Sequence, residues 1–343
     1  MVPRGTYLQQ ERTRVACQQA CSSCAGVVSR DPRRSPDLVG YGLQVVRNTY
    51  QRENTVRQLN YQLKQLCQRN RDGSHATQRN RERILTLVAN QLHTLGYRGM
   101  SATSLKPKHV DALVNHWRSA ELSPGTLKNR MSALRWWAEK VHRENVIARD
   151  NAHYGIPDRQ FVTGESRAVA LEEASLGRVK DEHVRMSLEL QKDFGLRREE
   201  AIKFQPAYAD HGDHIVLKAS WTKGGKARVV PIRNESQRAT LDRTRALARN
   251  GSLIPADRSY RQQLRLYERH TANAGMSKLH GLRHAYAQRR YAEITGRVAP
   301  AAGGPAASAL TAQQRAQDRA ARRTISKELG HEREQITSVY LGR

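Results

Sequence analysis

Six side chains that could act on a phosphate group follow one another through the second half of the chain. They occur in four motifs: FGLRREEA, TKGGKARVVPI, HGLRHAYA and ELGHEREQITSVY. The six residues are Arg197, Lys223, His280, Arg283, His331 and Tyr340. An attack on a DNA phosphodiester needs a nucleophile, a proton acceptor, a proton donor and cations around the phosphorus, and this set contains all four. The sequence therefore predicts a phosphate-cleaving site.

The residue types suit that chemistry. Each planar guanidinium of Arg197 and Arg283 can donate two hydrogen bonds to the non-bridging oxygens and keeps its charge near neutral pH. A tyrosine hydroxyl has an ordinary pKa of about 10 and is a poor nucleophile until its proton is removed or nearby cations stabilise its anion. Tyr340 would meet that condition inside this cluster.

These motifs, in this order and with His331 nine residues before Tyr340, resemble those of the tyrosine site-specific recombinases of the phage integrase family. The resemblance covers most of residues 45–343. We assign the first arginine to Arg197 rather than Arg198, because Arg197 directly follows Gly-Leu as in the family pattern. We expect His284 to be structural.

The resemblance implies a role for each residue. Arg197 and Arg283 would hold the scissile phosphate, Lys223 would protonate the leaving 5′-oxygen, and His280 would act in acid/base exchange.

The remaining two residues complete the implied mechanism. His331 would support the transition state, and Tyr340 would form a 3′-phosphotyrosyl link that conserves the bond energy for religation. The resemblance implies no cofactor and no metal, since cationic side chains take the electrostatic role that Mg²⁺ has elsewhere.

The implied function is site-specific DNA recombination that integrates or excises a mobile element. Its partner would be double-stranded DNA with inverted-repeat core sites, on which a homo-tetramer acts through a Holliday junction, with or without a DNA-bending accessory protein. The location would be the cytoplasm, in association with the bacterial nucleoid. Two alternatives stay open: a type IB topoisomerase-like enzyme, and a catalytically silent DNA-binding protein of the same fold.

Composition agrees with a DNA substrate. The chain has 59 Lys and Arg against 32 Asp and Glu, a net charge of +27 and a pI of about 10.6. Such a charge favours polyanions through counterion release. With 343 residues and 38% hydrophobic content, the chain is unlike short basic ribosomal or chromatin proteins. No run approaches the length of apolar sequence that a membrane span needs, so a membrane role is disfavoured.

The four cysteines do not form a disulfide framework in a chain of this length. Cys17, Cys21 and Cys24 are clustered and Cys67 is distant. Structural zinc sites usually show paired ligand spacing, which is missing, so we expect reduced thiols and no metal.

The expected fold is mainly α with a small antiparallel sheet (α+β), in which a helical core-binding domain precedes a tyrosine-recombinase catalytic domain. The expected parts are a flexible basic N-terminal arm over 1–41, a helical, SAM-like core-binding domain over 42–150, a linker over 151–165, and a catalytic domain over 166–343 with an inserted loop near 296–322.

The first domain is expected to be helical because its apolar residues recur at three- and four-residue steps. Its last helices, in SPGTLKNRMSALRWWAEK, resemble the part of the family's core-binding domain whose polar face lies on DNA. The predicted DNA-contact residues are Thr126, Lys128, Asn129 and Arg130. We expect Trp136 and Trp137 to be core residues, since a bundle helix must bury an apolar stripe.

Two local patterns place the catalytic residues. Between residues 213 and 232 the hydrophobic period is two, interrupted by Gly-Gly, which predicts a β-hairpin with Lys223 at its tip. In HGLRHAYA, His280, Arg283 and His284 would share one face of a helix, with Ser277 as its N-cap.

Two features depart from the family pattern. His331 lies 48 residues after Arg283, and the Gly-Ala-Pro run between them has a composition that predicts a surface loop followed by a basic helix. Three residues follow Tyr340, whereas many relatives have a tail helix that docks on a neighbouring subunit. The hypothesis is that segment 296–322 or the N-terminal arm replaces that contact.

Overall fold

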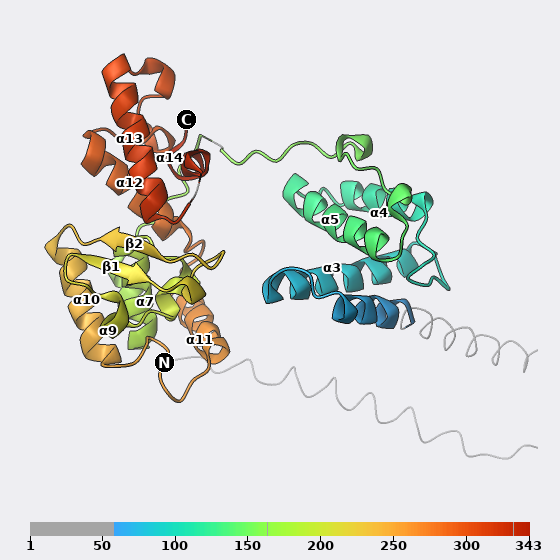
Figure 1. Cartoon of the computed structure of the whole chain (residues 1–343), viewed down its shortest axis with the longest axis horizontal. Helices are drawn as coiled ribbons and strands as arrows, with labels where there is room; N and C mark the ends of the chain where they lie inside the picture. The colour runs from blue at the N-terminus through green and yellow to red at the C-terminus, as the bar shows by residue number, and fades with distance from the viewer. Residues whose placement is uncertain (1–57, 163, 332) are drawn as a thin grey trace, which may run out of the picture. The chain divides into compact units, whose positions relative to one another are not determined.

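The computed structural model describes residues 58–343, except 163 and 332, and these form two compact units (Figure 1). The first unit is Met1–Arg159 and the second is Gln160–Arg343. The expected arm over 1–41, with Cys17, Cys21 and Cys24, lies outside the described residues.

The described part of the first unit is helical. Residues 58–69 form a helix, followed by α3 (His75–Thr94), α4 (Pro107–Ser119), α5 (Pro124–Lys140) and the short 3-10 helices η1 (Glu144–Val146) and η2 (Ala152–Tyr154). The Ser74 and Ser123 hydroxyls cap α3 and α5 by accepting from backbone N–H groups three residues later. Buried Leu85, Val88 and Leu92 of α3 follow the three- and four-residue steps expected of an amphipathic helix.

The two tryptophans of α5 are core residues, as predicted. Trp137 is fully buried and its indole N–H donates to the carbonyl of Ala102 at 2.7 Å. Trp136 is also buried, and its N–H donates to the carboxylate of Asp72 at 2.8 Å. The indoles therefore fix α5 against the loops at the ends of α3.

The boundary between the two units, after Arg159, falls within the expected linker of 151–165, but the first residues of that linker belong to the first unit. Tyr154 and Ile156 are buried in the core of the first unit, and the Tyr154 hydroxyl accepts a hydrogen bond from the N–H of Ala148 at 2.9 Å. Residues 151–156 are part of this core because they contribute two large apolar side chains to it.

The second unit is mainly helical with one small sheet, which confirms the predicted fold class. Its first half contains α6 (Glu173–Gly177), α7 (Glu182–Phe194), α8 (Arg198–Ile202), α9 (Pro206–Ala209), β1 (His214–Leu217), η3 (Ala219–Trp221) and β2 (Arg228–Pro231). Its second half contains α10 (Glu235–Ala248), α11 (Tyr260–Asn273), α12 (Gly281–Thr295), η4 (Pro300–Ala302), η5 (Ala307–Ala309), α13 (Ala312–Glu328), η6 (Glu334–Thr337) and α14 (Ser338–Leu341).

Strands β1 and β2 pair antiparallel, in the region where the hairpin was predicted. The register joins His214 to Pro231 and Leu217 to Arg228. Ile215, Leu217 and Val230 are buried on one face. The connection is longer than a tight hairpin, because η3 and an exposed turn lie between the strands.

Helix α7 is the central element of the second unit. It contacts α8, α10, α11 and α12, and its residues Leu188, Leu190 and Phe194 are fully buried. Asp181 caps its N-terminus through the N–H of Val184 at 3.0 Å, and Gly195 ends it in the left-handed region at φ 61°. A Cβ at Gly195 would lie 2.5 Å from the Tyr286 ring, so this turn requires glycine for space as well as for conformation.

Segment 296–322 contains a mostly exposed loop, residues 302–309, followed by a helix, but both ends of the loop are packed. Ala299, Ala301 and Leu310 are buried, and α13 begins at Ala312 behind a Thr311 cap. Small alanines allow close backbone approach, which is why a Gly-Ala-Pro composition can still belong to a packed region.

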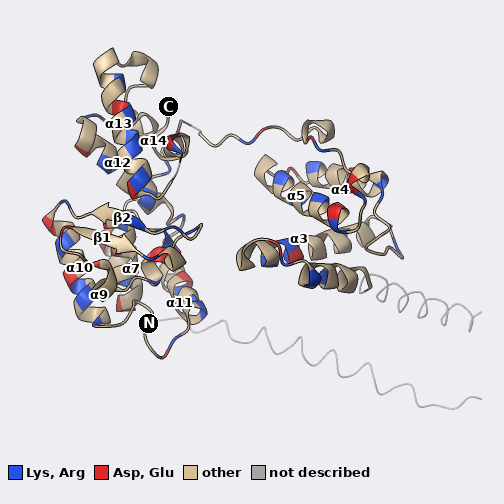
Figure 2. Cartoon of the chain, viewed as in Figure 1, with Lys and Arg blue, Asp and Glu red and all other residues tan. Residues whose placement is uncertain are grey.

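Basic residues occur on the helices of both units (Figure 2). Within residues 58–343, the described helices include none that is long and apolar enough to cross a membrane.

Candidate active site

The site is built around the start of α12. The helix begins at Gly281 and His280 is its N-cap, so the predicted cap at Ser277 is wrong. Segment 167–169 packs directly on this turn: the N–H of Val169 donates to the carbonyl of Gly281 at 3.1 Å, and a Cβ on Gly281 would lie 2.4 Å from Val169 Cγ2. This close approach explains the glycine that follows His280.

Arg283 lies one turn into α12 and is 1% exposed. Its terminal nitrogens donate to the carbonyls of Gly195 and Leu329, and its Nε lies 3.4 Å from the Tyr340 hydroxyl. Burial, followed by the charges of Arg228 and Arg197, lowers the pKa of Arg283 to about 10. The guanidinium stays charged at neutral pH, and these contacts use three of its five N–H groups.

Tyr340 is brought to Arg283 from the far end of the chain by α14. Its side chain is 5% exposed, and its ring lies 4.5 Å from the ring of His284 and 5.6 Å from that of His331. Gln288 of α12 donates to the Tyr340 carbonyl at 3.0 Å, and the adjacent Leu341 is fully buried. The backbone on both sides of the phenol is therefore held against the unit that carries the arginines.

Three imidazoles surround the phenol. His280 keeps an exposed edge, with its ring 6.1 Å from the Tyr340 ring. Burial and the charges of Arg283 and Arg197 lower the pKa of His280. Burial and the same two charges, with Arg228, lower the pKa of His331 to about 3.

His284 is the most enclosed of the three, at 4% exposed. Burial, then the charges of His280, Arg167 and Arg283, lower its pKa to about 4. Its Nδ1 and the Nε2 of His331 are buried and have no hydrogen-bond partner within the described part of the protein. Both rings are therefore neutral at pH 7, and their low pKa values make them weak proton acceptors.

A buried carboxylate joins two arginines beside this cluster. Glu200 is 0% exposed; it accepts two hydrogen bonds from Arg228 at 2.7 Å each and one from the Arg197 guanidinium at 2.8 Å. Its second oxygen also accepts the backbone N–H of Arg197 at 2.7 Å. Burial alone would raise the pKa of Glu200, but hydrogen bonding to Arg228 and the charges of Arg228, Arg283 and Arg197 lower it to about 2.

Lys223 lies in the exposed turn between η3 and β2. Among the described residues it forms no hydrogen bond or ion pair with the other five predicted residues. A lysine here can reach outward on its flexible stem.

The fold thus brings five of the six predicted residues to one place and leaves Lys223 on the exposed turn between η3 and β2. Sequence reasoning missed Glu200, Arg228 and the closeness of His284 to the phenol. One signal was available for Glu200, because it lies three residues after Arg197 at the start of a helix, where an acidic side chain can bond back to the cap residue.

The predicted DNA-contact residues lie on α5 of the first unit, and nothing in the structure tests their contact with DNA. Lys128 is paired with Asp158 at 2.7 Å. The Arg130 guanidinium lies 5.2 Å from the Trp117 ring centre. Asn129 is exposed and lines a hollow of about 490 Å³ together with Arg81 and other residues of α3 and α5. The Thr126 hydroxyl lies 3.0 Å from that of Ser123.

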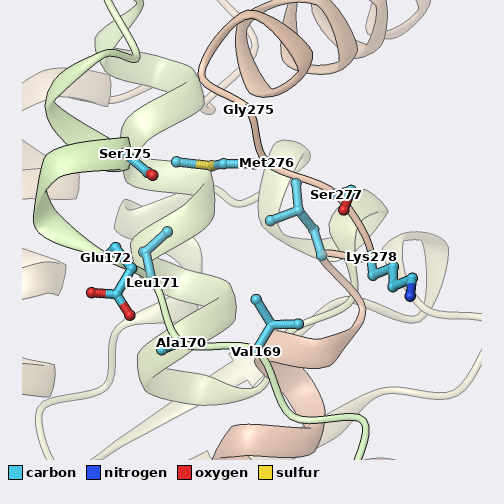
Figure 3. Close-up of a pocket in the computed structure, with 10 residues that line it drawn as sticks. Val169, Ala170, Leu171, Glu172, Ser175, Gly275, Met276, Ser277 and Lys278 are labelled. Atoms are coloured by element: carbon cyan, nitrogen blue, oxygen red, sulfur yellow. The ribbon is translucent and has the colours of Figure 1, made fainter.

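A further cavity of about 250 Å³ lies between segments 169–175 and 275–279 (Figure 3). Leu171 and Met276 line it from these two segments, and Glu172 and Lys278 are its charged lining residues (Figure 3). None of the six predicted catalytic residues lines it, so it is separate from the cluster around Tyr340.

Among the described residues, no group of three or more His, Cys, Asp or Glu side chains is placed to hold a metal ion. Cys67 is buried in the first unit. Burial raises the pKa of its thiol to about 11, which leaves it protonated and unreactive at neutral pH.

Comparisons with known proteins agree with this architecture. A family model for the phage integrase N-terminal region matches residues 56–147, and an integrase model matches residues 148–289. Together the two matches span more than half of the chain. The second includes Arg197, Lys223, His280 and Arg283, and ends before His331 and Tyr340. No curated protein matches the sequence.

Solved structures share the fold at low sequence identity. A lambda integrase dimer bound to a COC′ core site is 14% identical, has a TM-score of 0.57, and the match covers 99% of this chain and 89% of that one. A lambda integrase tetramer bound to a Holliday junction is 15% identical with a TM-score of 0.54, covering 93% and 90%. XerH site-specific recombinase, bound to a palindromic difH substrate in a post-cleavage complex, is 18% identical with a TM-score of 0.51, covering 83% and 81%. The chain belongs to the phage integrase family of tyrosine recombinases.

Proposed function

We propose that this chain is an active site-specific DNA recombinase that cleaves and rejoins DNA through a 3′-phosphotyrosyl intermediate. The observation that carries the proposal is the position of the Tyr340 hydroxyl, 3.4 Å from Arg283 Nε and among three imidazoles. A protein that only binds DNA does not require a phenol at this position, whereas attack on a phosphodiester requires a nucleophile beside a fixed cation.

Each residue has a proposed part in the reaction. Arg197 and Arg283 bind the non-bridging oxygens and stabilise the charge that develops on them. Tyr340 attacks the phosphorus and its proton passes to a neutral imidazole, assigned to His280.

Two residues act on the rest of the phosphate. Lys223, which lies on an exposed turn, protonates the departing 5′-oxygen. His331 lies beside the phenol and supports the transition state.

The proposed substrate is double-stranded DNA with inverted-repeat core sites, with Thr126, Lys128, Asn129 and Arg130 among the contacts made by the first unit. The proposed assembly is a homo-tetramer that passes through a Holliday junction, acts on a mobile element in the bacterial cytoplasm, and is aided by a DNA-bending protein where the site demands it. The relatives solved as a dimer on a core site and as a tetramer on a Holliday junction support this assembly.

The test is recovery of DNA that remains covalently attached to the protein after denaturation with detergent, followed by sequencing of the attached ends. Tyr340→Phe keeps the ring and removes only the hydroxyl, so it should abolish attachment while DNA affinity is retained. Tyr208→Phe is the matched control, because Tyr208 is 43% exposed in the same unit and lies outside the cluster.

Attachment through a 3′-phosphate at one recurrent sequence would establish the mechanism and reveal the crossover site. Attachment at scattered sequences would favour the topoisomerase-like alternative. Tight DNA binding with no attachment in the parent protein would favour the catalytically silent binder and contradict the proposal.

A further inference from the structure

The turn that carries Lys223 has little intrinsic order. Lys223, Gly224 and Gly225 are exposed, and both glycines have φ in the left-handed region, at 92° and 67°. Glycine loses more backbone entropy on ordering than any other residue. A lysine that must deliver a proton to one atom therefore depends on a constraint from outside these three residues.

Thr222 supplies such a constraint. Its Oγ1 accepts the backbone N–H of Lys226 at 3.1 Å and lies 2.6 Å from the Lys226 carbonyl and 3.0 Å from the Ala219 carbonyl. A hydroxyl has one hydrogen and two lone pairs, so it can accept the N–H and donate to one of the two carbonyls. The hydroxyl thus closes a ring around Lys223, Gly224 and Gly225.

The two sides of this ring are attached to the core. Trp221 is 6% exposed and its ring packs near those of Phe204 and Tyr208. On the other side, Arg228 is buried and doubly bonded to Glu200. Thr222 therefore lies where a rigid base meets the exposed tip.

We propose that Thr222 is a positioning residue for Lys223, and that its hydroxyl holds the turn in the form that protonates the leaving group. This inference rests on the proposed function. In the step concerned, the Tyr340 oxygen bonds to phosphorus, its proton passes to His280, and the bond from phosphorus to the 5′-oxygen breaks. The 5′-oxygen takes a proton from the Lys223 ammonium and leaves as a hydroxyl, and religation reverses these transfers.

The experiment compares two duplexes that carry the crossover sequence recovered from the attached DNA. One has the natural 5′-oxygen at the scissile phosphate and the other has sulfur in its place. A thiol is a much stronger acid than an alcohol, so a thiolate can leave without being protonated. Cleavage of the sulfur duplex therefore does not need a proton from the lysine. Single-turnover cleavage is measured with the full-length protein.

Thr222→Val keeps the shape of the side chain and removes the hydroxyl. We expect this variant to cleave the oxygen duplex about tenfold more slowly than the parent protein does, which is the effect of losing about one hydrogen bond. It should cleave the sulfur duplex at the same rate as the parent protein. Thr222→Ser should restore the rate on oxygen. Thr324→Val, an exposed threonine of α13 in the same unit, should behave as the parent on both duplexes. Amide hydrogen exchange over residues 223–227 should be faster in Thr222→Val than in the parent.

Other results would overturn the inference. Equal slowing of Thr222→Val on both duplexes would mean that Thr222 stabilises the fold and does not position the lysine. An unchanged cleavage rate on the oxygen duplex, or unchanged amide hydrogen exchange, would mean that the hydrogen-bonded ring is not needed. Lys223→Ala should cleave the oxygen duplex about 100-fold or more slowly than the parent protein, and the sulfur duplex should restore its cleavage rate. If the sulfur duplex does not restore the rate, Lys223 does not protonate the leaving group, and the proposed role of Thr222 is wrong as well. The phosphotyrosyl link is judged separately, by attachment through Tyr340.

Discussion

Glu200 sets the electrostatics of the site at the scale of single residues. Three guanidinium groups, those of Arg197, Arg228 and Arg283, lower the pKa of this buried carboxylate, and two of them bond to it directly. Like charges at this spacing would repel one another strongly in a water-poor site. The carboxylate balances part of that charge and fixes the direction of Arg197, while leaving most of the Arg197 donors for a phosphate.

Glu200→Gln should be strongly destabilising. The amide keeps the shape of the side chain but removes the charge that Arg228 and Arg197 face, and breaking a buried ion pair from one side costs roughly 3–5 kcal/mol. Denaturant unfolding of the full chain would measure the loss. Glu199→Gln is the control, because the carboxylate of Glu199 is exposed and Glu199 is the neighbour of Glu200 in the chain. A loss no larger than that of the control would contradict the proposed importance of Glu200.

The low pKa of His284 predicts a pH dependence of stability. In the unfolded chain His284 binds a proton below its ordinary pKa of 6.5, whereas in the folded protein it does so only near 4. The unfolded state therefore binds more protons between these values, and stability falls as pH drops from 6.5 toward 4, by about 1 kcal/mol per pH unit.

Urea unfolding at a series of pH values between 7 and 5 would check this dependence. His284→Gln should make the curve less steep, with the contribution of His331 remaining, and His75→Gln, at an exposed position of the first unit, should leave the slope unchanged. An equally steep curve in His284→Gln would show that other groups cause the loss.

At the scale of elements, the site depends on how segment 167–169 meets the start of α12. The segment is hydrogen-bonded to the Gly281 carbonyl, and Ser166 donates to Gln288 at 3.1 Å. Gln288 in turn holds the Tyr340 carbonyl. The chain that enters the second unit therefore supports both the helix with Arg283 and the helix with the phenol.

Gly281→Ala should impair cleavage without abolishing DNA binding. The added methyl would lie 2.4 Å from Val169 Cγ2 and 2.6 Å from the Arg167 carbonyl, so the segment or the helix start must move, and the adjacent His280 moves with it. A displacement of about 1 Å in a catalytic group can cost about 100-fold in rate. The effect would be measured as the single-turnover cleavage rate, together with the DNA affinity of the same variant.

Gly177→Ala is the matched control, because a Cβ there meets nothing within 4 Å and Gly177 also lies in a helix. Parent-like cleavage by Gly281→Ala would show that the contact with segment 167–169 does not position the site.

At the scale of the whole molecule, the net charge of +27 dominates any encounter with DNA. Both units carry basic helices (Figure 2), so we expect phosphate contacts from both. Affinity from such contacts comes largely from released counterions and is insensitive to base sequence.

DNA affinity should fall by about 10³-fold or more between 50 and 200 mM salt if several phosphates are neutralised. Lys128→Ala should reduce the slope of log affinity against log salt by about one, since it removes one predicted phosphate contact. Lys64→Ala, an exposed lysine outside the predicted contact set, should leave the slope unchanged. Equal slopes in the parent and Lys128→Ala would remove Lys128 from the contact set.

By itself, the sequence determined the fold class, the burial of Trp136 and Trp137, the hairpin region around Lys223, and which six residues to consider together. These follow from local periodicity, turn residues and short motifs, which depend on neighbours in the chain.

Only the tertiary structure decided the rest. The bonds of Glu200 to Arg228, the contact of Gly281 with Val169, and the packing of Ala299 and Ala301 join residues that are distant or uninformative in sequence. The enclosure of His284 and His331 likewise depends on which helices meet. Burial and charge from non-adjacent elements set these properties, and no local pattern records them.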